Sequence, residues 1–258
     1  MNDTLQSFQR LLDIMNELRE KCPWDKKQTL ESIRPLTIEE TYELSEAILE
    51  GDVHNVRKEL GDLLLHIVFY AKIASEQSAF TIKDVMDSLC DKLVYRHPHV
   101  FGDVEASTAG QVMKNWEQLK LKEKDGNKTV LSGVPASLPA LIKAQRIQEK
   151  ARAVGFDWEQ REQVWGKVQE ELDELRAEVE KMDTQKVEAE LGDLLFSVVN
   201  AARLYGVDPE TALERTNKKF IKRFGYLERE TIKKGRPLTQ MTLAEMNEVW
   251  EEAKKAEG

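Results

Sequence analysis

The stretch ELGDLL at residues 59–64 is repeated without change at residues 190–195. Each copy follows an acidic block, EETYEL at residues 39–44 and EELDEL at residues 170–175. The separation between the acidic block and the repeated stretch is the same in both halves of the chain. Self-similarity at a fixed spacing is typical of duplicated structural units. The sequence therefore predicts two copies of one domain.

Three further pairs of short motifs extend the repeat in the same order. Each half contains a lysine four residues before an arginine, a Trp-Glu-x-x-Lys motif near its end, and an aromatic residue followed by Asp before its acidic block. Leucines recur at helical spacing for packing alone, whereas repeated carboxylates and cations indicate a shared chemistry. The pairs are Lys92 with Arg96 and Lys219 with Arg223, residues 116–120 and 250–254, and residues 23–25 and 155–157.

Helix-forming residues dominate the composition. The 258 residues include only 13 glycines and 7 prolines, and they are rich in Leu, Glu, Lys, Ala and Gln, which lose little on entering a helix. Apolar residues between positions 60 and 71 recur every three or four residues, as one helix face requires. Thr37 with Glu40 and Thr242 with Glu245 fit the capping box that begins a helix. The sequence predicts an all-α fold.

The regular pattern breaks between residues 124 and 140. A turn-forming Asp-Gly-Asn sequence is followed there by a glycine and two prolines, a composition typical of a connection between domains. We therefore expect an N-terminal helical bundle at residues 1–125, a linker at 126–139 and a C-terminal helical bundle at 140–258.

Composition and charge exclude several classes of protein. No run approaches the ~18 to 20 apolar residues of a membrane span, and the first ten residues lack the basic start of a signal peptide, so we expect a cytoplasmic protein. The formal net charge of −9 disfavours direct binding to nucleic acid or to an anionic membrane. With two cysteines and four histidines, the chain has too few ligands at suitable spacing for a zinc cluster.

The acidic blocks predict a site for a divalent cation. Residues three apart share a helix face, so we expect Glu171 and Glu174 to lie on one face of their helix, and Glu190 and Asp193 on one face of the next helix. A short turn between the two helices makes them antiparallel and brings both pairs together. Two like charges ~4 Å apart repel by about 4 kcal/mol at an effective dielectric near 20, and the acidic run at 39–50 contains no lysine to relieve this. Mg²⁺ or Mn²⁺, which prefer oxygen ligands, are the natural counter-charge.

Two other interpretations of the acidic blocks stay open. Acidic helix faces are most often simply solvated, although repetition of the whole set favours a metal site. A carboxylate-bridged di-iron bundle expects Glu-x-x-His on its inner helices. The residue three positions after each Glu is Asp62 or Asp193 rather than histidine, which favours redox-inert Mg²⁺.

At these residues the chain resembles the MazG family of nucleoside triphosphate pyrophosphohydrolases, all-α enzymes with Glu-Glu-x-x-Glu followed by Glu-x-x-Asp. The resemblance covers nearly the whole chain as two tandem MazG-like domains. It implies Mg²⁺-dependent hydrolysis of NTPs or dNTPs to the monophosphate and pyrophosphate, and assembly as a homodimer. It implies metal ligands at Glu170, Glu171, Glu174, Glu190 and Asp193, their first-copy equivalents at Glu39, Glu40, Glu43, Glu59 and Asp62, and nucleotide contacts at Lys186, Lys219, Arg223, Trp250 and Lys254.

Physical chemistry suggests roles within this set. Metal ions would neutralise phosphate oxygens and orient a water for attack at the α-phosphorus, and the lysines and arginine would bind the remaining oxygens. Glu170 or Glu171 would accept the proton of the water. Trp250 would stack on any base, which suits broad base specificity, or would be a residue of the core.

The two halves also differ. Lys186 stands four residues before Glu190, where the first copy has Asn55, so we expect the C-terminal domain to be the main catalyst. The first domain keeps its whole acidic set, and weak catalysis, nucleotide sensing or dimerisation stay open for it. The rival hypothesis is a non-catalytic helical adaptor that senses nucleotides or contacts a basic partner protein.

Overall fold

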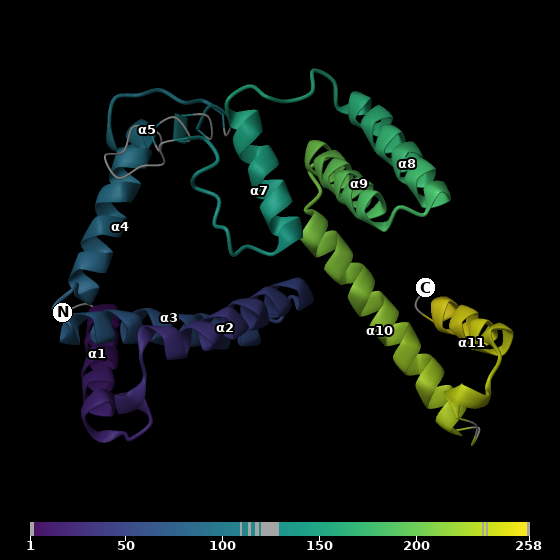
Figure 1. The fold of residues 1–258 in the computed structure, drawn as a ribbon. Coiled ribbons are helices and arrows are strands. Elements are labelled where there is room, and N and C mark those ends of the chain that lie inside the picture. The colour runs from purple at the N-terminus through teal and green to yellow at the C-terminus, as the bar shows by residue number, and fades with distance from the viewer. Residues whose placement is uncertain are drawn as a thin grey trace. The chain divides into compact units, whose positions relative to one another are not determined.

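The computed structural model describes residues 3–108, 110–112, 115–116, 119, 129–233, 235 and 237–256. Every regular element among them is a helix, which confirms the all-α prediction for this part of the chain (Figure 1). None of the described helices is both long enough and apolar enough to cross a membrane. The chain divides into two compact units, Met1–Glu105 and Ala106–Gly258. The linker expected at 126–139 stays a prediction, because residues 120–128 lie outside the described part.

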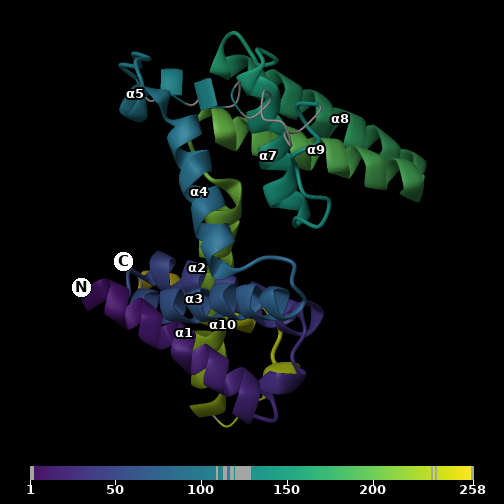
Figure 2. The same ribbon diagram turned by 90° about the vertical axis from the view of Figure 1, so that its left-hand side faces the viewer.

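The first unit is built around a pair of long helices, α2 (Leu30–Glu50) and α3 (Val53–Glu76). α1 (Asp3–Lys21) packs against α3, and the 3-10 turn η1 (Asp25–Lys27) connects it to α2. α4 (Ile82–Arg96) follows α3 and leads into the short helix α5 (Pro98–Phe101). Figure 2 shows α1 beside the α2 and α3 pair.

The core of the first unit lies where α1, α2 and α3 meet. Met15, Ile33, Val68, Phe69 and Ile73 form one cluster, and each is at most 3% exposed. Burying an apolar side chain of this size contributes about 1.5–3 kcal/mol. This cluster therefore fixes how the three helices pack on one another.

The second unit repeats the helix pair with α8 (Val164–Lys181) and α9 (Thr184–Leu204). α7 (Ala140–Ala153) packs against α9, as α1 packs against α3. α10 (Pro209–Lys233) and α11 (Leu243–Lys255) pack together. The 3-10 turns of this unit are η2 (Arg161–Gln163) and η3 (Leu238–Gln240).

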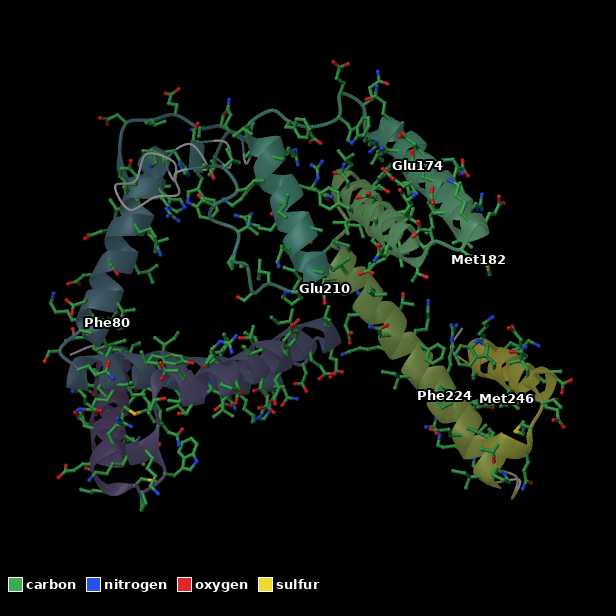
Figure 3. All side chains as sticks on the ribbon, viewed as in Figure 1. Phe80, Glu174, Met182, Glu210, Phe224 and Met246 are labelled. Carbon is green, nitrogen blue, oxygen red and sulfur yellow. The ribbon has the colours of Figure 1, made fainter. Side chains whose placement is uncertain are left out.

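A turn of two residues joins the helices of each pair. Its first residue has left-handed backbone geometry, with φ 69° at Gly51 and φ 58° at Met182, which lies at the end of α8 (Figure 3). Its second residue caps the next helix, since the side chains of Asp52 and Asp183 accept hydrogen bonds from backbone N–H groups of α3 and α9. Such a short turn holds the two helices antiparallel, as the sequence predicts.

One predicted helix start is wrong and another is confirmed. Thr37 lies inside α2, where its hydroxyl bonds to the carbonyl oxygen of Ile33 and, at 2.6 Å, to the hydroxyl of Tyr70. The helix begins earlier because an upstream threonine supplies the capping box. Thr242 does cap α11 together with Glu245, as expected.

An arginine–carboxylate pair fastens each unit. Arg19 of α1 donates to both carboxylate oxygens of Glu76 at the end of α3, at 3.1 and 2.5 Å, and lowers the pKa of that carboxyl. Arg203 of α9 donates to both oxygens of Asp157. Burial alone would raise the pKa of Asp157, but hydrogen bonds from Arg203 and the backbone lower it.

Candidate metal and nucleotide site

Each helix pair brings three predicted metal ligands together. One carboxylate oxygen of each residue lies within 4.8 Å of the other two. Two of the residues lie one turn apart on the first helix of the pair, and the third comes from the second helix, as helical spacing predicts; Figure 3 labels Glu174 on the stretch of α8 beside α9. The sets are Glu40, Glu43 and Glu59, termed the first cluster, and Glu171, Glu174 and Glu190, termed the second cluster.

The first cluster is short of positive charge. Glu59 is only 4% exposed, and its Oε1 accepts a hydrogen bond from Nζ of Lys58 at 3.0 Å. Its other oxygen, Oε2, is buried and finds no hydrogen-bond partner among the described residues. The pKa of Glu40 is raised, first by burial and then by the negative charges of Asp62, Glu43 and Glu59. The ionised cluster is therefore held together at an electrostatic cost.

The second cluster contains a lysine from its own helix. Nζ of Lys167 lies 2.7 Å from Oε1 of Glu171, which is 6% exposed, and 2.9 Å from Oε1 of Glu170. Hydrogen bonds to these two carboxylates raise the pKa of Lys167. The pKa of Glu174 is nevertheless raised, first by burial and then by the charges of Glu171, Glu190 and Glu170. One lysine does not neutralise this cluster.

Neither lysine is among the predicted site residues. The first acidic run contains no lysine, and Lys58 belongs to the second helix of its pair, where it stands next to Glu59. Lys167 stands four residues before Glu171 on the same helix, and this spacing is a recognisable signal for an ion pair. The sequence thus carried enough information to find Lys167, but not Lys58.

The remaining predicted ligands lie at the edges of the clusters. Asp62 lies one turn beyond Glu59, and its negative charge helps to raise the pKa of Glu40. Asp193 is exposed on α9. Glu39 and Glu170 are exposed beside the converging residues of their helices. Within the residues that the structure describes, none of these carboxylates belongs to a converging set. Their roles as ligands stay predictions.

The predicted nucleotide contacts near the C-terminus lie on a different helix pair. Lys219 and Arg223 belong to α10, and Trp250 and Lys254 belong to α11. Trp250 is half-buried, and its ring centroid lies 5.1 Å from that of Phe220 in a tilted contact between the two helices. This contact gives Trp250 a packing role, which is one of the two alternatives that the sequence leaves open.

Of the predicted nucleotide contacts, Lys186 is the closest in sequence to the second cluster. It lies in the first turn of α9, one turn before Glu190, and its Nζ is 3.7 Å from Oδ2 of Asp183 in an exposed ion pair. Exposed pairs of this kind contribute about 0–1 kcal/mol. The ammonium group is therefore easily released to an anionic ligand.

Both clusters fit a hard divalent cation. All of the converging donors are carboxylate oxygens, which Mg²⁺ and Mn²⁺ prefer. Raised carboxyl pKa values in both clusters and the buried, unpartnered oxygen of Glu59 indicate that positive charge is needed there. We conclude that the residues present suit such an ion.

Comparison with known proteins relates both helix pairs to one family. The MazG nucleotide pyrophosphohydrolase domain matches residues 28–101 and again residues 160–226. The first match contains the first cluster, and the second match contains the second cluster. The chain belongs to the MazG family. This membership confirms the expected family, its tandem arrangement, and the prediction of an enzyme that hydrolyses acid anhydrides.

Two individual relatives match nearly the whole chain, and a third matches more than half of it. The chain is 44% identical over 260 residues to the nucleoside triphosphate pyrophosphohydrolase of Escherichia coli (strain K12), with 98% of this chain and 99% of that one covered. It is 47% identical over 250 residues to the nucleoside triphosphate pyrophosphohydrolase/pyrophosphatase MazG of Thermotoga maritima, covering 96% and 95%. A Mycobacterium tuberculosis nucleoside triphosphate pyrophosphohydrolase is 42% identical over 156 residues, covering 58% of this chain and 47% of that one.

Proposed function

We propose that this MazG protein hydrolyses NTPs and dNTPs to the nucleoside monophosphate and pyrophosphate in a Mg²⁺-dependent reaction with broad base specificity. The observation that carries the proposal is the convergence of three carboxylates in each MazG-matched helix pair. The names of the E. coli and T. maritima relatives support the substrate class. Broad base specificity rests on the stacking role proposed for Trp250, since stacking accepts every base.

The second cluster would hold the metal for the reaction. Glu171, Glu174 and Glu190 would supply oxygen ligands, with Glu170 and Asp193 at the edge of the site. When bound, Mg²⁺ or its substitute Mn²⁺ supplies charge neutralisation for the triphosphate and increases the acidity of a coordinated water. The equivalent residues of the first cluster would bind a metal in the first unit.

The protein's own side chains carry the remaining steps. Glu170 or Glu171 accepts a proton from the attacking water, whose oxygen forms a bond to the α-phosphorus. The bond from the α-phosphorus to its bridging oxygen breaks, and pyrophosphate leaves with that oxygen as one unit. Lys186, Lys219 and Arg223 bind phosphate oxygens and stabilise the negative charge that develops on the leaving group.

The second unit is the main catalyst in this proposal. Lys186 gives it a cation one turn before Glu190, whereas Asn55 stands at the matching position of the first unit. An exposed ammonium at that place attracts a triphosphate, and a neutral amide does not. The first unit would then bind metal without contributing much turnover.

Product analysis in ¹⁸O-labelled water tests the reaction. The protein is incubated with single NTPs and dNTPs in the presence of Mg²⁺. The products are then separated, and their masses are measured by mass spectrometry. Attack at the α-phosphorus places the label in the monophosphate, and equimolar pyrophosphate forms. Label in pyrophosphate or orthophosphate would refute the point of attack. Nucleotide binding without turnover would favour the adaptor hypothesis.

Two matched variants separate the candidate proton acceptors. Glu170→Gln and Glu171→Gln each remove one carboxylate while keeping its size. The variant that lacks the proton acceptor should lose turnover but keep its Mg²⁺ affinity, which calorimetry measures. The variant that lacks a metal ligand should lose both turnover and Mg²⁺ affinity. Loss of metal affinity in both variants would show that neither residue is a base alone.

We also propose that the protein forms a homodimer through apolar stripes of exposed side chains on α3 and α9. The two stripes occupy matching positions of the repeat, and their residues stay exposed to solvent. Single exposed apolar residues are common on protein surfaces, whereas contiguous apolar patches mark interaction sites, and the repeated stripes therefore support a partner surface on α3 and α9. Sedimentation equilibrium of wild type and Leu195→Glu would test this, with a shift to monomer expected in the variant. The stripes are Leu60, Leu64 and Ile67 on α3, and Leu191, Leu195 and Val198 on α9.

A further inference from the structure

Lys167 lies where a cation is needed in the second cluster. Its Nζ is 2.7 Å from Oε1 of Glu171 and 2.9 Å from Oε1 of Glu170. The two partners differ in exposure, since the side chain of Glu171 is 8% exposed and that of Glu170 is 54% exposed. The short contact to a buried carboxylate therefore distinguishes Lys167 from ordinary surface lysines.

The first unit has no lysine at this place. The position four residues before Glu40, which corresponds to Lys167 in the repeat, is Leu36. The lysine of the first cluster is instead Lys58, whose Nζ is 3.0 Å from Oε1 of the buried Glu59. Both clusters thus contain one lysine against one buried carboxylate, but each lysine comes from a different helix of its pair.

We propose that Lys167 is a resident counter-cation of the second cluster, which a divalent metal ion must displace in order to bind. This inference rests on the metal site of the proposed function. The ammonium group keeps the carboxylates of the metal-free protein together, and it competes with the metal for Glu171. Lys167 therefore sets how much free Mg²⁺ the unit needs before it is loaded.

Charge and mobility explain the exchange. An ion bound to the carboxylate of Glu171 would lie close to an ammonium group that bonds to the same carboxylate, and the two like charges would repel. The lysine is the mobile partner, because its side chain is 38% exposed on a flexible stem, whereas Glu171 is fixed by burial. Lys167 swings into solvent, and Glu171 stays in place for the metal.

Calorimetric titration of Mg²⁺ into Lys167→Leu tests the proposal, because leucine is the residue of the first unit at this position. The titration uses a Glu43→Gln background, so that the first cluster is weakened and the second dominates the signal. Loss of one competing charge-assisted pair should tighten the Mg²⁺ dissociation constant about tenfold. The melting temperature should fall in EDTA and approach that of the parent in saturating Mg²⁺.

The outcomes separate this proposal from the proposed function. Unchanged or weaker Mg²⁺ binding in Lys167→Leu would overturn the counter-cation role and leave the metal site intact. Absence of Mg²⁺ binding in the parent would refute the proposed function itself. Lys167→Gln, which keeps a polar side chain, provides the same comparison if the leucine variant does not fold. Lys233→Leu removes a lysine of α10 whose 2.7 Å partner, Glu230, lies outside the cluster, and it should leave the affinity unchanged.

Discussion

The two acidic clusters share their carboxylates but not their cations. Matching positions of the repeat supply the three converging oxygens in both units, whereas Lys58 pairs from α3 in one unit and Lys167 pairs from α8 in the other. A carboxylate that binds a metal must occupy one place, whereas a neutralising ammonium on a long side chain reaches the same place from several positions. The comparison therefore separates the geometry that the site requires from the charge balance that each unit achieves locally.

The largest expected effect is a difference in turnover between variants of the first cluster and variants of the second cluster. We expect Glu174→Gln to reduce pyrophosphate release by about 100-fold or more, because even residues that only orient metal ligands contribute about 10- to 100-fold. The matching variant of the first unit, Glu43→Gln, should change the rate by less than about twofold. The first unit has Asn55 at the position that corresponds to Lys186. Steady-state kinetics with circular dichroism as a folding control measures both. Equal losses would show that both units turn over.

The arginine pairs that fasten the units should differ in strength. Arg203→Met breaks a pair whose side chains are 6% and 19% exposed and should destabilise the second unit by about 2–3 kcal/mol. Arg19→Met breaks a pair that is 10% and 36% exposed and should destabilise the first unit by about 1–2 kcal/mol. Hydrogen exchange resolved by peptide assigns each loss to its unit. An exposed pair supplies the control, Arg176→Met, for which less than about 0.5 kcal/mol is expected.

The turns between paired helices should respond in opposite directions. Met182→Gly relieves a left-handed backbone in a residue with a side chain and should stabilise the second unit by about 0.5–1 kcal/mol. Gly51→Ala introduces that strain into the first unit and should destabilise it by about 1 kcal/mol, although a Cβ there would meet no neighbour within 4 Å. Thermal unfolding of both variants checks the signs. A neutral result for both would mean that the turns carry no strain.

The smallest expected effect is a pH dependence of the metal-free protein. A carboxyl whose pKa is raised in the folded state costs stability when it ionises, so Glu174 destabilises above its raised pKa and has no such effect well below its ordinary value of 4.5. Glu174→Gln should therefore melt slightly above wild type at pH 7 in EDTA, and the difference should disappear near about pH 3, where the carboxyl is protonated in both states. Saturating Mg²⁺ at pH 7 should reverse the order, since only wild type keeps the ligand.

Local patterns in the sequence predict most of the fold and part of the site. The helix pairs follow from periodicity, and their antiparallel packing follows from the short turns. The helix start predicted at Thr37 is wrong because the spacing of Thr37 and Glu40 resembles a capping box. Thr29 and Ser32 exchange the actual capping hydrogen bonds. The hydroxyl of Thr37 is instead bound to Tyr70, a contact between helices that no local pattern encodes.

The residues that the sequence predicts to contact the nucleotide show what sequence reasoning does not supply. Helical spacing determines which residues share a face of one helix, but not which helix packs against which. Lys219 and Trp250 belong to the pair formed by α10 and α11, whose packing depends on contacts such as that of Trp250 with Phe220. Tertiary contacts between distant segments are therefore the part that the sequence alone did not supply.

The two-residue turns also bear on how the chain avoids mispairing while it folds. α3 and α9 carry the same six residues, so α2 could in principle pair with the wrong copy. Closing a loop of two residues costs far less entropy than closing one that spans half the chain, and contacts between neighbouring segments form first. Domains generally fold as units during synthesis, beginning at the N-terminus, so we expect the first helix pair to form before its duplicate leaves the ribosome. Synthesis order and short connections then both disfavour exchange between the copies.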